Sequence, residues 1–383
     1  MSGDGNPQKR PASRRTFLKV AGGTAALGFV AGCLGGGNNG GGSGGTPTAT
    51  AKPTATPTPT PMQFPQNTIK FIVPYGPGGG YDFYVRSVAK VLMQDKIVPV
   101  DTKVENVEGA SGITAANQVY SAKPDGYTNM IVNTGSFCLS QLARPDAVKY
   151  DMSKFTALPR VAGTTMSAAV STQSGINTGD ELLAAIQKNQ VKFGNEGPNE
   201  SAAIMFKSIA ALGGLDFTVD DYNNNQVTFN GKGEWYTAIK QGTVDVMAGS
   251  FSSLRKYVDS GDLKFVMVLS MDDSCPAGAG SGCQTFAQLK TDLKNKEQII
   301  NLTGGPYHRI FVGPPGMDDN VHNYLCEKIT AAIQSDTFKS LAQQAKRPIL
   351  YGDCTLANKG IDGTLQTYKD NKDVLKQIGV LSG

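Results

Sequence analysis

The sequence predicts an α/β protein with two lobes, each built on a mostly parallel sheet. Apolar, β-branched segments alternate with segments of helical periodicity, which is the rhythm of a parallel sheet with helices on its faces. The part of the chain with a globular composition, residues 66–383, is longer than a single compact domain usually is. The succession of a strand, a small polar loop and a helix also occurs in both halves.

The N-terminus predicts export and lipid anchoring. Residues 13–19, Ser-Arg-Arg-Thr-Phe-Leu-Lys, have the form of a twin-arginine signal. The apolar segment 20–32 has the length of a signal-peptide core and is too short for a membrane-spanning helix. It ends in Val-Ala-Gly-Cys33, the pattern of a lipobox, so we expect cleavage before Cys33 and lipidation of its thiol. The alternative is an ordinary signal peptide with a chance cysteine. Residues 1–32 are therefore left out of the predicted fold.

Residues 34–65 are rich first in Gly and then in Thr and Pro, a composition that cannot bury enough apolar surface to fold. The glycine-rich half is flexible, and the Thr/Pro-rich half is an extended chain of about 3 Å per residue. With two or three acyl chains on Cys33, residues 33–65 would form a stalk that tethers a monomeric domain to the outer side of the cell membrane.

Composition argues against several functions. The net charge is +4, part of it lies in the signal peptide, and no basic run follows, so we expect no nucleic-acid partner. With two histidines and no Cys-x-x-Cys, we expect neither a metal nor a cofactor. Four of the five cysteines beyond the lipobox are expected to form disulfides, Cys275–Cys283 and Cys326–Cys354. Cys138 is then left over as a small buried apolar side chain.

The first lobe, residues 66–163, reads as β-loop-α-β-loop-α-β. Its predicted elements are strand 69–73, a helix over 83–92, strand 98–106, a helix ending at 119 and strand 130–134.

The loop between the first strand and the first helix contains three consecutive glycines, Gly78, Gly79 and Gly80. Glycines let the backbone approach a ligand and aim N–H groups at it, and the following helix adds the positive end of its dipole. These features predict a cradle for a small anion; the alternative is a structural turn without a ligand. A dinucleotide fingerprint would need glycine in place of Tyr81, and a phosphate loop would need Lys-Ser or Lys-Thr after the glycines.

Four sequence blocks carry a family resemblance. They are Pro74-Tyr-Gly-Pro-Gly-Gly-x-x-Asp82-x-x-x-Arg86, Val104-Glu-Asn106 with Gly109-x-x-Gly112, Pro124-Asp-Gly-Tyr-Thr128, and Tyr150-Asp151 with Phe155-Thr156. In order and spacing they resemble the solute-binding proteins of tripartite tricarboxylate transporters, and the resemblance continues more weakly to the C-terminus. It implies a type II periplasmic-binding-protein fold, or Venus flytrap, with a ligand cleft between its lobes. Such a protein captures a small carboxylate, an organic acid or an amino acid, and delivers it to a membrane permease.

Two other functions stay open. One is a sensor subunit whose lobe closure signals to a membrane kinase, and a more distant one is an exported enzyme on the same scaffold. No nucleophile–base pair stands out, because His308 and His322 have no neighbouring Ser or Cys motif. We therefore expect a binding protein and not an enzyme.

The resemblance implies ligand residues on both lobes. In the first lobe the candidates are Tyr75, Gly78, Gly79, Gly80, Tyr81, Asp82, Ser111, Thr134 and Ser136. Asp82 opens the first helix, where we expect its carboxylate to complement the helix dipole and fix the loop without touching the ligand. The two tyrosines either line the cleft or lie on the surface.

The second lobe, residues 164–305, contains a similar loop. Its predicted elements are strand 166–172, a helix from 179 with Thr178 and Glu181 as capping box, strand 191–194, helices 202–212 and 235–240, and strands 243–250 and 263–269. The resemblance implies that loop 195–201 faces the glycine loop across the cleft. The candidate ligand residues here are Asn195, Gly197, Asn199, Ser201, Ser250 and Ser252.

The second lobe departs from the family pattern at two places. Glu196 and Glu200 stand where small neutral residues are usual. They either point to solvent or face the cleft, where they would repel a second carboxylate or pair with an amine. Residues 227–231 lack the lysine of the Pro-Tyr-Lys-Gly-like turn found in the family, so one possible cation is lost.

Residues 306–383 return to the first lobe, with amphipathic helices over 321–333 and 338–345. Arg309 stands where part of the family has an aromatic-Arg-Gly sequence at the hinge. It is the best cationic candidate for the ligand, because a guanidinium grips a carboxylate with two hydrogen bonds. The alternative is an ion pair across the hinge.

Overall fold

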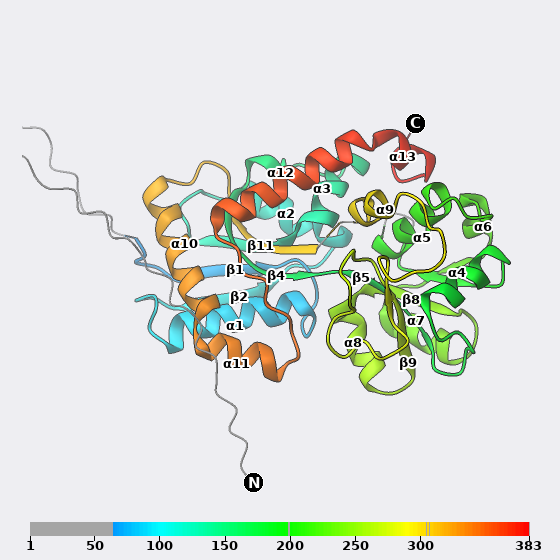
Figure 1. The fold of residues 1–383 in the computed structure, drawn as a ribbon. Helices are drawn as coiled ribbons and strands as arrows, with labels where there is room; N and C mark the ends of the chain where they lie inside the picture. The colour runs from blue at the N-terminus through cyan, green and yellow to red at the C-terminus, as the bar shows by residue number, and fades with distance from the viewer. Residues whose placement is uncertain (1–63, 198–199, 304, 306, 383) are drawn as a thin grey trace, which may run out of the picture. The chain divides into compact units, whose positions relative to one another are not determined.

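The computed structural model describes residues 64–197, 200–303, 305 and 307–382 (Figure 1). The export signal, Cys33, the stalk up to residue 63 and Asn199 lie outside this part of the chain, so the expectations for them stay predictions. Within the described residues, no helix combines the length and the apolar composition needed to cross a membrane.

The first sheet has the strand order β2-β1-β3-β11-β4. Its bounds are β1 Ile69–Val73, β2 Thr102–Asn106, β3 Thr128–Asn133, β4 Thr156–Thr164 and β11 Tyr307–Gly313. β1 is parallel to β2 and to β3, whereas β11 is antiparallel to both of its neighbours. The predicted α/β class with mostly parallel sheets is thus confirmed, with one reversed strand.

The second sheet has the order β10-β9-β5-β8-β6-β7. Its bounds are β5 Met166–Ser171, β6 Phe193–Asn195, β7 Gln226–Thr228, β8 Val246–Ser250, β9 Leu263–Val268 and β10 Gln284–Thr285. Here β5 is the reversed strand, antiparallel to β8 and β9. β5 follows β4 after the single residue Thr165, and β11 is the strand by which the chain re-enters the first sheet. Each sheet therefore receives its reversed strand where the chain crosses over.

Helices cover both faces of the first sheet (Figure 1). They are α1 Gly80–Gln94, α2 Ile113–Tyr120, α3 Thr134–Ala143, α10 Asp319–Gln334, α11 Asp336–Gln344, α12 Cys354–Asp370 and α13 Lys372–Gln377. β1 shows how the sequence builds this layering, because Phe71 and Val73 pack with α1, α10 and α11 while Ile72 packs with α2, α3 and α12. Alternate side chains of a strand point to opposite faces, so a continuous apolar run marks a strand buried on both.

The second lobe adds six helices among the described residues. They are α4 Gly179–Gln187, α5 Ser201–Leu212, α6 Val219–Asn224, α7 Lys232–Lys240, α8 Phe251–Asp259 and α9 Lys296–Leu302. The predicted capping box of α4 is half right: the Thr178 hydroxyl accepts the Glu181 N–H at 3.1 Å, but the Glu181 carboxylate accepts from Asn177. A complete capping box starts α6 instead, between Thr218 and Asp221.

The second predicted strand starts later than expected, at Thr102 and not at residue 98. The N–H groups of Ile97 and Val98 still bond to the carbonyl of Leu92 in the last turn of α1, and Lys96 has a positive φ of 51°. The apolar residues of this segment are therefore part of a turn that closes the helix.

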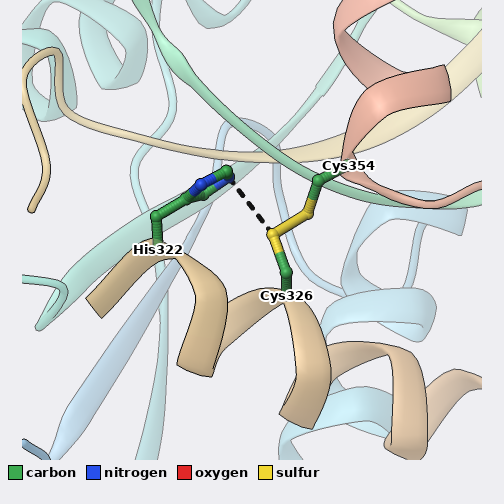
Figure 2. Close-up of side chains that lie close together, drawn as sticks. All are labelled: His322, Cys326 and Cys354. Atoms are coloured by element: carbon green, nitrogen blue, oxygen red, sulfur yellow. Dashed lines mark hydrogen bonds between the residues drawn. A yellow bond between two sulfur atoms is a disulfide. The ribbon is translucent and has the colours of Figure 1, made fainter. Parts of the chain in front are cut away.

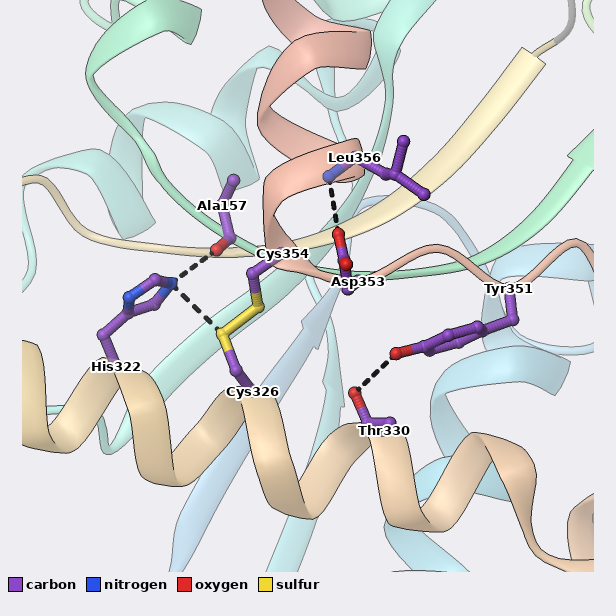
Figure 3. Close-up of a disulfide and its surroundings, with 8 residues drawn as sticks. All are labelled: Ala157, His322, Cys326, Thr330, Tyr351, Asp353, Cys354 and Leu356. Carbon is purple, nitrogen blue, oxygen red and sulfur yellow. Dashed lines mark hydrogen bonds between the residues drawn. A yellow bond between two sulfur atoms is a disulfide. The ribbon is translucent and has the colours of Figure 1, made fainter. Parts of the chain in front are cut away.

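One of the two predicted disulfides is confirmed. Cys326 on α10 is bonded to Cys354 at the start of α12, across a sequence separation of 28 (Figure 3). By loop entropy alone such a crosslink stabilises the fold by about 3–4 kcal/mol. His322 Nε2 lies 3.2 Å from the Cys326 sulfur and donates to the Ala157 carbonyl at 2.9 Å (Figures 2 and 3). Three metal-type ligand atoms thus lie together, but the two sulfurs are already bonded to one another.

The predicted Cys275–Cys283 disulfide is wrong, because both residues are free thiols that hydrogen bond to each other. Their loop is closed by other means: Ala279 N bonds to Pro276 O at 3.0 Å, and the Arg255 guanidinium holds Ala277 O at 2.9 Å. Burial raises the pKa of both thiols. Cys138 is buried and forms no disulfide, as predicted.

Candidate ligand-binding cleft

A cavity of about 430 Å³ lies between loops of the two lobes. The residues singled out from the sequence that line it are Tyr75, Gly79, Gly80, Tyr81, Ser136, Glu196, Glu200, Ser201, Ser250 and Arg309. Those not singled out are Asn133, Met166, Ala202, Lys232, Ala248, Gly249 and Ser253. Asn133 and Ser250 are the last residues of β3 and β8, so the cavity lies where ligands bind in open α/β sheets, at the carboxyl ends of strands.

The glycine loop is fixed by Asp82, which is buried in the first turn of α1. Its carboxylate accepts from Gly78 N at 3.0 Å, Arg86 Nε at 2.9 Å and Asn106 Nδ2 at 3.0 Å. Burial alone would raise the pKa of Asp82, but the hydrogen bonds from Arg86, Gly78 and Asn106 outweigh it and lower the pKa. Asp82 therefore stays ionised and positions the loop, while the Gly78 N–H, expected to face a ligand, is already occupied.

The wall beside the loop is a short network at the end of β3. The Asn133 amide donates to the Tyr81 hydroxyl and to Ser136 Oγ, and its oxygen caps α3 by accepting the Ser136 N–H at 2.6 Å. The Tyr81 ring packs 4.8 Å from the ring of Tyr75. Burial raises the pKa of Tyr81, so its hydroxyl is neutral. Asn133 was missed because an Asn at a strand end is usually no more than a helix cap.

Arg309 is the unneutralised cation of the cleft. Its side chain is only 6 % exposed and lies over the rings of Tyr81 and Tyr84, at 5.1 and 5.4 Å from the guanidinium carbon. Its Nε and Nη1 have no hydrogen-bond partner, and it forms no ion pair with any described carboxylate. The register of β11 on β4 shifts next to this residue, a bulge of the kind that redirects a side chain. The alternative of an ion pair across the hinge is therefore wrong for the described residues.

The opposite wall carries the acids. Glu196 forms an ion pair with Lys232, the first residue of α7, which also lies 5.7 Å from the Trp235 ring centre. Glu200 lies at the start of α5 and accepts a hydrogen bond of 3.2 Å from Ser111 Oγ in the first lobe. Burial raises the pKa of Glu200, and the charge of Glu196 raises it further. Both glutamates thus face the cleft. Lys232 supplies a cation directly after residues 227–231, the segment that lacks the lysine typical of the family.

Several candidates lie off the cavity. Asn195 is buried and shapes the second loop by accepting from Gly197 N at 2.8 Å and Thr228 Oγ1 at 3.1 Å. Thr134 is fully buried. Gly197 does not line the cleft either. Gly78 and Ser252 line a neighbouring pocket, and Ser111 lines a small side cavity together with Glu200.

Two α/β lobes joined by crossing strands, with a cavity between strand ends, define a two-lobed solute-binding protein. The chain belongs to the family described as tripartite tricarboxylate transporter family receptor, whose sequence model matches residues 85–380. By this description its members are receptors of tripartite tricarboxylate transporters. The family resemblance drawn from the four sequence blocks is thereby confirmed.

Individual relatives agree with this assignment. A UPF0065 protein of Bordetella pertussis is 26 % identical over 280 residues, covering 72 % of this chain and 79 % of the relative. BugT of the same organism is 21 % identical over 291 residues, covering 75 % and 83 %.

Solved structures show the same fold. The periplasmic binding protein BugD is 18 % identical with a TM-score of 0.64, covering 83 % of this chain and 99 % of its own. A Rhodopseudomonas palustris protein with adipate is 16 % identical with a TM-score of 0.65, covering 82 % and 98 %. MatC from the same organism, with bound malate, is 17 % identical with a TM-score of 0.61, covering 82 % and 100 %.

Proposed function

We propose that this protein captures a small carboxylate that also carries an amine, such as an amino acid, and delivers it to a permease of the tripartite tricarboxylate type. The observation that carries the proposal is the opposition of charges across the cleft. Arg309 is buried without an anion on the first lobe, and Glu200 is half-buried without a cation bonded to it on the second.

A carboxylate suits the first-lobe wall. A buried guanidinium without an anion beside it is costly, and a ligand carboxylate would supply the charge and the oxygen acceptors that Arg309 lacks. Gly79 and Gly80 form the N-terminus of α1, where no side chain caps the helix, so their backbone and the helix dipole favour an anion at the same place.

An amine suits the second-lobe wall. Glu196 is neutralised by Lys232, which leaves Glu200 as the acid whose charge is not balanced by an ion pair. An ammonium group beside Glu200 would favour its ionised form and form a charge-assisted hydrogen bond. A second carboxylate at this position would instead meet a carboxyl group of like charge.

Lobe closure completes the proposal. The lobes are connected by Thr165 between β4 and β5 and again where the chain passes from α9 to β11, and we expect closure about these two crossings. The permease would bind the closed form. The solved relatives with adipate and with malate support carboxylates as ligands. The lipobox and twin-arginine motif support export and anchoring at Cys33.

The test is a thermal-shift screen of the purified protein against carboxylates with and without an amine, followed by calorimetry of the hits. A ligand at a hundred times its Kd should stabilise the protein by about 2.7 kcal/mol. We expect the largest shifts from amino carboxylates, smaller ones from amine-free carboxylates and none from the corresponding amides. Responses from sugars or metal cations alone would contradict the proposal.

A further inference from the structure

A second cavity of about 270 Å³ adjoins the cleft beside the glycine loop. Its first-lobe wall is made by Gly78, Arg309 and the segment 345–347 after α11, and its second-lobe wall by α8 and Lys232. Five residues line both this cavity and the cleft: Gly79, Gly80, Lys232, Ser253 and Arg309. The two cavities are therefore neighbours that share the glycine loop and Arg309 as their common border.

The second cavity is strongly basic. Six cationic side chains line it against a single acid, Asp259: Lys232, Arg255, Lys256, Arg309, Lys346 and Arg347. Asp259 accepts from Arg255 at 2.7 Å and from Lys346 at 3.0 Å, and Lys232 is paired with Glu196.

Three of the six cations have no carboxylate partner among the described residues. They are Arg309, Arg347 and Lys256, of which Lys256 lies 4.7 Å from the ring centre of Tyr257. Like charges that line one cavity repel one another unless an anion lies between them.

Two of these cations converge on Gly80. A Cβ atom placed on Gly80 would lie 3.5 Å from Arg309 Nη2 and 3.5 Å from Arg347 Nη1, so both guanidinium groups reach the same point. Burial lowers the pKa of Arg347, and the positive charge of Arg309 lowers it further. Arg347 is held there by its bond to Ser252 O at 3.2 Å.

Buried donors without partners lie at the same border. Arg309 Nε and Nη1 make no hydrogen bond, and neither does Ser252 Oγ; these side chains are only 6 % and 7 % exposed. Buried polar groups are normally satisfied, so a cluster of unsatisfied donors beside unpaired cations indicates a site for an acceptor.

We propose that this basic pocket, bounded by Arg309, Arg347 and Ser252, binds an oxyanion group other than the carboxylate held in the cleft. Carboxylate, sulfate and phosphate groups share the chemistry that fits, because guanidinium forks match paired oxygen atoms. The group is either a free inorganic anion or the distal acidic group of a solute that reaches past Gly80. In both cases it joins cations of the two lobes and so favours the closed arrangement. The inference extends the proposed function to a second anion.

Two kinds of probe test the pocket at low ionic strength. The first is sodium sulfate, with melting temperature as the readout. The second is a pair of isosteric acid–amide sets, glutamate with glutamine and adipate with its monoamide, with Kd from calorimetry. The variants are Arg347→Gln, the charge-conserving Arg347→Lys, and Lys90→Gln, which removes an exposed cation on α1 away from the pocket.

If the occupant is a free anion, we expect sulfate to raise the melting temperature of the wild type and of Lys90→Gln. If it is a distal group of the solute, we expect both proteins to bind the acids about tenfold more tightly than their amides, as one or two charged hydrogen bonds would give. Arg347→Gln should remove the effect and Arg347→Lys should keep part of it. Sulfate that adds to the binding of a monoamide identifies a free anion as the occupant. Sulfate that competes with the acid but not with the monoamide identifies a distal group of the solute.

The inference is overturned if sulfate has no effect and acids bind no better than amides, or if Arg347→Gln leaves those effects intact. Its failure is distinguishable from that of the proposed function. If the protein binds monoamides and shows no preference for a second acidic group, only the hypothesis of the basic pocket is contradicted. If sulfate stabilises the protein through Arg347 but no carboxylate binds, only the proposed function is contradicted. If Arg347→Gln does not fold, Lys256→Gln takes its place with the same expected loss.

Discussion

The two walls of the cleft share the succession of strand, loop and helix but differ in charge. The first-lobe wall presents the glycine loop and the unpaired Arg309, while the second presents Glu196 and Glu200. Asp82 anchors the first loop and Asn195 the second, so both walls are pre-organised by a buried side chain that stays off the cavity. Loop geometry therefore forms the site, and the opposed charged side chains set the direction in which a ligand lies.

Removing the cation of the first wall should have the largest effect. In Arg309→Met, the ligand carboxylate loses two charge-assisted hydrogen bonds, so we expect affinity to fall on the order of 100-fold. Stability without ligand should stay the same or rise, because a buried charge without a partner is replaced by an apolar side chain. Calorimetry and thermal melting measure the two effects. Unchanged affinity together with lost stability would mean that Arg309 is structural.

Loosening the first loop should have a smaller effect on affinity. Asp82→Asn removes the charge that holds Gly78, Arg86 and Asn106, so we expect about 1–3 kcal/mol of lost stability and a roughly tenfold weaker ligand. Because the folded pKa of Asp82 is lowered, its contribution is present above the unfolded pKa of about 3.9 and is lost as pH falls through the folded pKa. Urea melts at several pH values should therefore show the wild type and the variant converging in acid. A constant difference down to low pH would contradict this role.

Neutralising the second wall should discriminate between ligands. Glu200→Gln should weaken an amino carboxylate by about tenfold and leave its amine-free analogue unchanged, because only the amine uses the charge. Without ligand, the raised pKa of Glu200 lowers stability as pH rises from the unfolded value of about 4.3 through the folded pKa. The variant should therefore melt higher than the wild type at neutral pH and no higher in acid. Equal losses for both ligands would show that Glu200 shapes the wall without selecting for an amine.

Removing the disulfide should affect neither wall. The double variant Cys326→Ser, Cys354→Ser is expected to lose about 3–4 kcal/mol of stability by loop entropy, with ligand affinity unchanged. It is the control for the other variants, since it separates lost stability from lost binding. A large change in Kd for this variant would mean that the link between α10 and α12 reaches the cleft.

Sequence reasoning worked where the signals are local. The apolar run of β1, the glycine loop and the periodicity of α1 lie within residues 69–94, and all were predicted. β4 and β11 were not predicted as strands, although they pair with each other and form the way in and out of the first sheet. Their pairing joins residues about 150 positions apart along the chain, and glycines, a proline and arginines interrupt their apolar pattern.

The same limit applies to the site. Residues on the two predicted loops reached the cleft, but Lys232 and Asn133 were missed because nothing nearby in the sequence marks them. The Cys275–Cys283 pairing failed because short spacing along the sequence does not by itself give two cysteines the geometry of a disulfide. The charge of the cleft depends on which cations find a partner, and that follows only from three-dimensional contacts such as those of Lys232 with Glu196.

The most direct test of the account is a crystal structure with the amino carboxylate that gives the largest thermal shift. We expect the carboxylate within about 3.2 Å of the Arg309 guanidinium and the backbone of Gly79 or Gly80, with the amine facing Glu200. A ligand whose carboxylate lies against the second lobe, with Arg309 still unpartnered, would contradict it.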